Sequence, residues 1–398
     1  MSKVLLGDVA EERRETCKGN KDGYPTVGLE HLTPEEITLT SWDEGSDNTF
    51  TKMFRKGDVL FGRRRAYLKK AAVAPFDGIC SGDITVIEAK PNYLLPELLP
   101  FIIQNDALFS FAVEKSAGSL SPRVKWEHLK SYEFELPNMD KQRELAELLW
   151  AMDDTKKSYQ QLIAATDELV KSQFIEWFGD PASNPFCWEV SSIGGIASDV
   201  RYGTSRAAVS GGKYPYLRMN NLTADGKLDL SDLKYIDLPS SELKKCLVHK
   251  GDILFNRTNS KEWVGKTALF DLDEDMVIAG YIVRVRVKPY ILPSFVVAYM
   301  NLPYMKKILK SMAKGAVHQA NISAKEMQGI QIYLPPLSLQ EQFAAFVRQS
   351  DKSKFAVLNC LKRNLLLILQ KTEDVHSLIN QSAKKYFCKS CHRENHNG

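Results

Sequence analysis

The chain has 398 residues, which is too long for one ordinary domain, so two or three domains are expected. Its hydrophobic content of 44% and charged content of 26% are those of a soluble globular protein, and its apolar runs are too short for a membrane span. The net charge of +4 permits a polyanionic partner without requiring one.

The N-terminus and the cysteines bear on the compartment. MSKVLLGDVAEERR has neither the apolar core nor the cleavage site of a signal peptide. The seven cysteines are odd in number and mostly scattered, which favours a reducing environment over a disulfide framework. We therefore expect a cytoplasmic protein.

Residues 1–138 are predicted to form the first globular domain. The segments VLFGRRRAYLKKAAVAPF (59–76) and ITVIEAK (84–90) have the short alternating pattern of strands. The stretch from Pro96 to Glu114 is expected to be one helix. A sheet with a helix packed on it makes this domain α+β.

A long helix is predicted within 139–180. From Gln142 to Phe178 there is no Gly or Pro, and Gly179-Asp180-Pro181 is a stop signal. At the usual helical rise this helix would be about 55 Å long, and its apolar seam requires a partner helix. The predicted seam is Leu145, Leu148, Met152, Thr155, Tyr159, Leu162, Thr166, Leu169 and Gln173, flanked by Leu149, Ile163, Val170, Phe174 and Trp177.

The second half follows the same plan. Residues 181–336 are predicted as a second α+β domain, with strands at ILFNRTN (253–259) and YIVRVRVK (281–288) and one helix from Pro293 to Lys314. A second long helix is expected over 337–382, although Asp351 and Lys354 weaken the beginning of its seam. The apolar residues of that seam are Leu358, Leu361, Leu365, Ile368, Val375 and Ile379.

An internal repeat relates the two halves. YPTVGLEHLT (24–33) matches YPYLRMNNLT (214–223), KGDVLF (56–61) matches KGDILF (250–255), and Gly82 matches Gly280. LPNMDKQREL (136–145) matches LPPLSLQEQF (334–343), and in this match we expect Gln142 to correspond to Gln342.

The repeat leads to a predicted architecture. We expect two tandem α+β domains separated by two long helices that form an antiparallel coiled coil, with pseudo-twofold symmetry. The alternative is two unrelated amphipathic helices, each packed on its own domain.

Cations, amides and aromatic residues cluster after both KGD strands. Lys suits phosphate contacts, whereas Arg and Asn suit bidentate contacts to base edges. A solvated loop is the alternative for one such cluster, and the recurrence in both halves favours DNA contact. The first cluster is Arg63, Arg64, Arg65, Tyr67, Lys69 and Lys70, and the second is Asn256, Arg257, Asn259, Lys261, Trp263 and Lys266.

Further candidate DNA contacts lie in polar loops. Arg218 and Asn220 replace Gly28 and Glu30 of the first half, as expected if each half reads a different sequence, although drift would give the same result. One further set is Tyr202, Thr204, Ser205 and Arg206 of the RYGTSR loop. The others lie in the loop before the last strand of each domain. They are Ser119, Ser121 and Arg123 in the first domain, and His318, Gln319 and Asn321 in the second.

No catalytic, cofactor-binding or metal-ligating set is predicted. Gly265-Lys266-Thr267 lacks the first glycine of a phosphate loop, and Asn184-Pro185-Phe186 lacks the cofactor loop of a methyltransferase. Cys388, Cys391 and His392 lie in a polar tail, 383–398, that is expected to be disordered. A zinc half-site completed by other ligands is the alternative there.

Several motifs together resemble the specificity subunits of type I restriction-modification enzymes. These motifs are KGDILFNRTNSKEWVGK, GAVHQANIS and LPPLSLQEQF in the second half, and KSQFIEWFGDP in the central helix. The resemblance implies that each globular domain is a target-recognition domain that reads one half of a bipartite DNA site. It also implies that the paired helices set the gap between the half-sites and dock two methyltransferase (modification) subunits.

The same resemblance implies a non-catalytic subunit of a type I site-specific deoxyribonuclease and adenine-DNA methyltransferase complex. S-adenosylmethionine, ATP and Mg would then be bound by the methyltransferase and restriction/translocase partners, with no cofactor on this chain. The alternatives are a coiled-coil scaffold without DNA specificity and a fused enzyme with its own catalytic activity.

Overall fold

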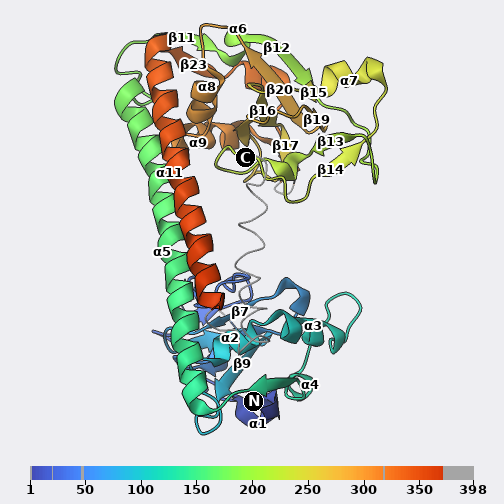
Figure 1. Ribbon diagram of the computed structural model, residues 1–398, viewed down its shortest axis with the longest axis vertical. Helices are drawn as coiled ribbons and strands as arrows, with labels where there is room; N and C mark the ends of the chain where they lie inside the picture. Colours follow the sequence, from blue (N-terminus) through green and yellow to red (C-terminus); the bar gives the residue numbers. More distant parts are fainter. Residues whose placement is uncertain (1, 20, 46–48, 317–318, 371–398) are drawn as a thin grey trace. The chain divides into compact units, whose positions relative to one another are not determined.

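The computed structural model describes residues 2–19, 21–45, 49–316 and 319–370 (Figure 1). The chain divides into two compact units. Unit 1 extends to Tyr159 and takes in the end of the last helix from Asn359, and unit 2 extends from Gln160 to Leu358. The cysteines and the histidine of the predicted tail lie outside the described residues.

Unit 1 contains two four-stranded sheets, ordered β2-β9-β6-β7 and β4-β3-β8-β5, and a two-stranded sheet, β1-β10. Its strands are β1 Ser2–Leu5, β2 Ala10–Glu12, β3 Pro25–Val27, β4 Asp43–Glu44, β5 Lys52–Phe54, β6 Val59–Gly62, β7 Ala71–Val73, β8 Gly78–Cys80, β9 Ile84–Ala89 and β10 Glu133–Leu136. Its helices are α1 Leu6–Val9, η1 Ala66–Leu68, α2 Leu99–Ile103, α3 Asp106–Glu114, α4 Trp126–Leu129 and the first part of α5 Met139–Phe178.

Unit 2 repeats this plan with sheets β12-β20-β16-β18, β14-β13-β19-β15 and β11-β23, and it adds the three-stranded sheet β17-β22-β21. Its strands are β11 Glu189–Ser192, β12 Ala197–Tyr202, β13 Tyr214–Leu217, β14 Lys234–Ile236, β15 Leu247–Val248, β16 Ile253–Asn256, β17 Thr258–Asn259, β18 Thr267–Leu269, β19 Met276–Ile278, β20 Ile282–Val287, β21 Lys314–Ala316, β22 Gln319–Asn321 and β23 Gln331–Leu334. Its helices are α6 Ile193–Ile196, η2 Met219–Asn221, α7 Ser240–Cys246, α8 Pro293–Met300, α9 Pro303–Met312, α10 Ala324–Gln328 and most of α11 Leu337–Gln370.

Strand register confirms the repeat. Val59 lies opposite Val73 and Ile87, and its counterpart Ile253 lies opposite Leu269 and Val285. A parallel strand pairing, β3 with β8 in unit 1 and β13 with β19 in unit 2, also recurs at equivalent positions. The two halves are therefore copies of one α+β fold, as the sequence predicts.

The KGD motifs have a structural role. Their glycines adopt φ of 93° and 94°, a left-handed conformation that suits glycine. The aspartates that follow, Asp58 and Asp252, are buried. Asp58 accepts hydrogen bonds from Arg13 Nε at 2.6 Å, and Asp252 accepts one from Arg286 Nε at 2.7 Å. A buried carboxylate with such a charge-assisted partner anchors the turn before β6 and before β16.

The two long helices run antiparallel, as predicted. Within unit 2, the Trp177 ring of α5 lies 6.0 Å from that of Phe343 on α11. Further along, Asp167 of α5 pairs with Lys354 of α11. From the first contact to the second, residue numbers decrease along α5 and increase along α11, so the two helices run in opposite directions. Figure 1 shows them side by side. The predicted seam residues Val375 and Ile379 lie outside the described part of the chain.

The predicted seam of α5 is wrong in the middle of the helix. Leu162 and Leu169 are 49% and 47% exposed, whereas Ile163 and Val170, expected only to flank the seam, are half-buried. A straight helix has 3.6 residues per turn, so its contact stripe drifts away from a strict seven-residue repeat. The stripe that begins at Leu145 has moved by one position when it reaches Ile163.

Three further predictions are corrected. The single helix expected from Pro96 to Glu114 is two helices, α2 and α3, because Asn105 leaves the helical conformation and caps α3 with its side chain; the Gln104 amide donates to the carbonyls of Glu36 and Ala71 at this break. The single helix expected from Pro293 to Lys314 is likewise divided into α8 and α9. There the Asn301 amide donates to Thr267 O at 2.8 Å.

The single strand expected over 59–76 is also wrong. The structure has β6, the short helix η1 and β7 in this segment. Arg65 and Lys69 on either side of η1 adopt φ of 55° and 52°, and the chain reverses direction in this segment because β7 returns antiparallel to β6.

Each long helix is joined to its domain by a buried glutamine. Gln142 Oε1 accepts from the Leu95 N–H at 2.8 Å, and Gln340 Oε1 accepts from the Leu292 N–H at 2.9 Å. The side-chain amide of each also donates to a proline carbonyl at the start of its helix. The counterpart of Gln142 is therefore Gln340, and the expected match to Gln342, which is exposed, is wrong.

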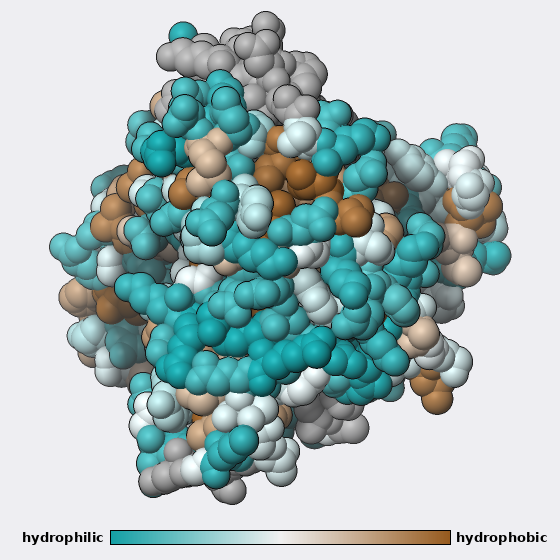
Figure 2. All heavy atoms as spheres, turned by 90° about the horizontal axis from the view of Figure 1, so that it is seen from below, coloured by the Kyte–Doolittle hydropathy of each residue, from teal (hydrophilic) through white to brown (hydrophobic). Residues whose placement is uncertain are grey.

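Each unit has its own apolar core. In unit 2, Phe174 and Phe178 of α5 pack with Phe295 of α8 and Phe343 of α11, so both long helices contribute to it. The view in Figure 2 shows a mainly hydrophilic surface with small apolar patches. No helix in the described ranges is long and apolar enough to cross a membrane.

Replacing the buried glutamine should destabilise the chain, whereas the same change two residues later should not. Gln340→Leu removes the acceptor of the Leu292 N–H and should lower the free energy of unfolding by about 2 kcal/mol. Gln342→Leu, at an exposed position, should change it by less than about 0.5 kcal/mol. Chemical denaturation of both variants measures the difference, and equal effects would contradict the assignment of Gln340.

The Asp167–Lys354 pair should be energetically coupled. The Lys354 side chain is only 7% exposed, so we expect a double-mutant cycle with Asp167→Ala and Lys354→Ala to give about 1 kcal/mol. The matched control is the exposed pair Lys171 and Glu168, whose coupling should stay below about 0.5 kcal/mol. Unfolding curves of the single and double variants provide the measurement, and a buried pair no stronger than the exposed one would refute the expectation.

Candidate nucleic-acid interface

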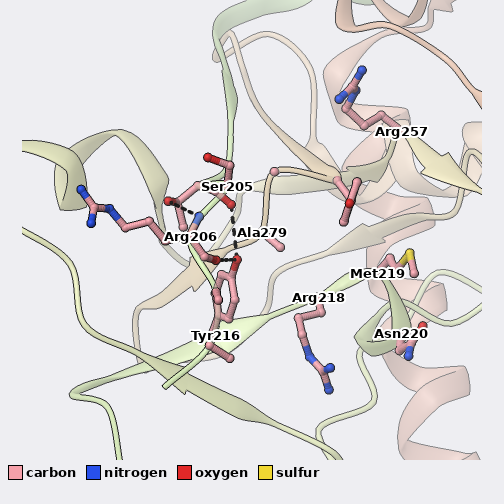
Figure 3. A pocket seen from close by; sticks show the side chains of 13 residues that line it. Ser205, Arg206, Tyr216, Arg218, Met219, Asn220, Arg257 and Ala279 are labelled. Carbon is pink, nitrogen blue, oxygen red and sulfur yellow. Dashed lines mark hydrogen bonds between the residues drawn. The ribbon is translucent and has the colours of Figure 1, made fainter. Parts of the chain in front are cut away.

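A cavity of about 580 Å³ opens at the strand ends of unit 2 (Figure 3). Its walls come from the loop after β12, the end of β13, the residue after β16 and the turn between β19 and β20. The sheet thus brings residues from four separate segments to one place. The lining residues are Thr204, Ser205, Arg206, Ala207, Ala208, Tyr216, Arg218, Met219, Asn220, Arg257, Ala279, Gly280 and Tyr281.

Tyr216 supports the loop that forms one wall of the cavity. Its ring is buried, and its hydroxyl donates to Arg206 O at 3.0 Å and approaches Thr204 O at 3.3 Å. Figure 3 shows these contacts as dashed lines. Burial raises the pKa of the Tyr216 phenol, so it remains a hydrogen-bond donor.

Two cavity arginines are oriented by carboxylates. Arg206 Nε lies 2.8 Å from Glu242, and Arg218 Nη2 lies 2.6 Å from Asp232. A hydrogen bond from the Thr204 hydroxyl, followed by the one from Arg206, lowers the pKa of Glu242. Each guanidinium therefore keeps its position while it retains further N–H donors for a ligand.

The residues after β16 have unequal positions. Asn256 is fully buried, and its amide contacts Met219 O and accepts from the Thr258 N–H, so it supports the fold. Trp263 is 44% exposed and lies outside the cavity, with Lys266 Nζ 5.2 Å from its ring centre. Burial lowers the pKa of Lys266.

The remaining candidates of unit 2 divide in the same way. Thr204 is buried and donates to Glu242 at 2.7 Å, and Asn321 accepts from the Thr258 hydroxyl at 3.2 Å. The Tyr202 hydroxyl accepts from the Ala324 N–H at 3.1 Å. The Asn259 side chain accepts from the N–H of Ser260. Among these remaining candidates, the exposed ones are Tyr202, Ser205, Asn220, Lys261 and Gln319, and His318 lies outside the described residues.

Unit 1 carries a different polar set on the equivalent turn. Asp83 accepts from Arg123 Nε at 2.7 Å and lies 3.4 Å from Arg64 Nη1, while Arg64 Nε donates to Ser121 at 2.6 Å. The hydrogen bond from Arg123 is the main cause of the lowered pKa of Asp83. This network brings three predicted residues together around one carboxylate.

The other predicted residues of unit 1 lie around this network. Lys69 pairs with Asp106 at 2.7 Å, and Lys70 donates to Leu29 O at 2.6 Å. Arg63 is half-buried. The remaining three, Arg65, Tyr67 and Ser119, are exposed.

Sequence reasoning missed several residues of this interface. Asp83 and Tyr281 occupy equivalent positions directly after the matched glycines Gly82 and Gly280, so the repeat itself could have identified them. Tyr281 is 51% exposed and lines the cavity. Glu242 and Asp232 carry no motif, because their role depends on arginines far away in the sequence.

The donor set is suited to an anionic, hydrogen-bonding surface. Arginine and amide side chains of this kind contact phosphates and base edges of duplex DNA. Across the described part of the chain, no three His, Cys, Asp or Glu side chains are grouped to hold a metal ion. The arrangement can bind a ligand of this kind.

Comparisons with known proteins agree with the repeat. The chain matches the type I restriction modification DNA specificity domain twice, over residues 2–165 and 186–367. It is 29% identical over 193 residues to a putative type I restriction enzyme MjaX specificity subunit from Methanocaldococcus jannaschii, covering 46% of this chain and 45% of that protein. It is 25% identical over 271 residues to the type I restriction enzyme EcoKI specificity subunit from Escherichia coli K12, covering 62% and 58%.

The chain thus spans about half the length of the curated relatives it matches. Among solved structures, the S subunit of a type I restriction-modification system from M. genitalium has a TM-score of 0.50 at 13% identity, covering 96% of this chain and 95% of that one. That likeness supports the fold. With two copies of the family domain over most of its length, the chain belongs to the type I restriction modification DNA specificity domain family.

Proposed function

We propose that this chain is the DNA-recognition subunit of a type I restriction-modification complex, and that each unit reads one half of a bipartite site. The observation that carries the proposal is the duplicated polar surface. The turn of unit 1 presents Asp83 with Arg64 and Arg123 beside it, whereas the equivalent turn of unit 2 presents Tyr281, and Arg218 lines the adjacent cavity. Two half-sites of different sequence require different side chains at equivalent positions of the same fold.

The proposal assigns the chemistry to partner subunits. The chain would act in the cytoplasm as a non-catalytic subunit with two modification subunits and restriction/translocase subunits. S-adenosylmethionine, ATP and Mg would be bound by those partners. The assignment rests on the family, because the two relatives described above are named as specificity subunits of type I restriction enzymes.

The proposal is tested by the DNA preference of the full chain purified with its modification subunits. Selection from a random duplex pool should return a bipartite sequence bound at least about 10³-fold more tightly than random duplex at physiological salt. Methylome sequencing of a host with and without the gene should show the same motif methylated. Equal affinity for selected and random duplex across a salt titration would refute the function.

Arg218→Ala should alter one half-site and leave the other unchanged. Loss of an arginine that reads a base edge costs about 1–3 kcal/mol and relaxes the preference at that base. The control is Arg348→Ala, which removes an exposed arginine from α11. Competition binding with single-base variants of the target measures both, and a preference that Arg218→Ala leaves intact would exclude base contact by this residue.

A further inference from the structure

Arg63 and Arg257 occupy the same place in the two units. The Arg63 N–H donates to Asp83 O at 3.0 Å, and the Arg257 N–H donates to Tyr281 O at 2.9 Å. Their carbonyls accept from the N–H groups of Val124 and Ile322 at 3.0 and 2.9 Å. The backbone of each arginine is thus held between the same two loops of its unit.

Among the residues that the structure describes, the side chains of these two arginines have no hydrogen-bond or ion-pair partner, unlike those of their neighbours. Both are half-buried, and the Nε of each is buried without a hydrogen bond among the described residues. Arg64 lies near Asp83, Arg206 near Glu242 and Arg218 near Asp232. Arg218 Nε is also buried and unbonded, but that guanidinium has its carboxylate.

A buried guanidinium donor without an acceptor is unfavourable in the free protein. Each Nε is closed to solvent, so a ligand can reach only the terminal nitrogens of these half-buried side chains, and the same arrangement at equivalent positions in two diverged units indicates such a ligand. A guanidinium binds phosphate through two parallel N–H···O bonds, and it binds a guanine edge in a similar way. The choice between these ligands depends on what else the two units share.

The residues around the two arginines differ between the units. Arg64 lies opposite Arg123 in unit 1, and the equivalent pair in unit 2 is Thr258 opposite Asn321. Asp83 is likewise replaced by Tyr281. A constant arginine within a changing polar set is suited to the one part of DNA that is the same in every sequence, its backbone.

We propose that Arg63 and Arg257 each bind a DNA backbone phosphate at the equivalent position of the two half-sites, and that they position the DNA without reading its sequence. The inference rests on the proposed function. In unit 2 the Arg257 guanidinium also lies 5.1 Å from the Tyr202 ring centre. Such stacking occupies the face of the guanidinium and leaves its in-plane donors for a phosphate.

The test uses Arg63→Gln and Arg257→Gln in the full chain purified with its modification subunits. Each change should weaken binding to the selected target and to random duplex by the same factor, about tenfold. Each should also reduce the slope of log K against log salt by about 1 and leave the recognised motif unchanged. Arg→Lys at either position should restore the slope and only part of the affinity, because lysine lacks the bidentate geometry.

The control is Arg348→Gln, which removes one exposed positive charge from α11 and should change neither affinity nor slope. Thermal unfolding provides a second readout. Since the Arg63 side chain has no hydrogen-bond partner among the described residues, Arg63→Gln should leave the melting temperature unchanged, and Arg257→Gln should lose only the contact with the Tyr202 ring. Variants that melt earlier and bind DNA normally would show a structural role and overturn the proposal.

The outcomes separate this inference from the function on which it rests. If the unaltered complex lacks a bipartite preference, the proposed function fails. If the unaltered complex has that preference and Arg63→Gln or Arg257→Gln changes the recognised bases, only the phosphate assignment fails. An unchanged affinity and salt slope in both variants would overturn the assignment in the same way.

Discussion

The buried glutamine at the start of each long helix is the contact on which the rest of the structure depends. Gln142 and Gln340 each hydrogen-bond to a backbone N–H of the domain and to a proline carbonyl at the helix start. A primary amide can satisfy both groups at once, since it carries an acceptor and a donor on neighbouring atoms. The direction in which each helix leaves its domain is set by this pair of bonds.

The surface proposed to contact DNA combines a constant backbone turn with side chains that differ between the units. The turn after Gly82 or Gly280 stays constant, while the side chains around it change from Asp83 and Arg123 to Tyr281 and Asn321. The backbone bonds that hold Arg63 and Arg257 use no side chain of the changing set. New side chains can therefore be placed on the surface without remodelling the strands beneath it.

Much of the fold could be predicted from sequence because its signals are local or repeated. The KGD turn requires a glycine at positive φ, and a helix free of Gly and Pro can be read directly. The breaks between α2 and α3 and between α8 and α9 have local signals, since Asn105 caps α3 and Pro303 begins α9, but the bonds from Gln104 and Asn301 to distant carbonyls could not be predicted. Neither could the partners of Arg206 and Arg218, since Glu242 and Asp232 carry no motif of their own.

In each unit the first strand pairs antiparallel with the last one. Ser2 lies opposite Leu136 in unit 1, and Glu189 lies opposite Leu334 in unit 2. The chain therefore enters and leaves each domain at one place, next to the start of a long helix. A segment with neighbouring ends can be exchanged for another while its surroundings stay intact. Recombination between genes at these two points would exchange a whole domain and leave the helix that follows it unchanged.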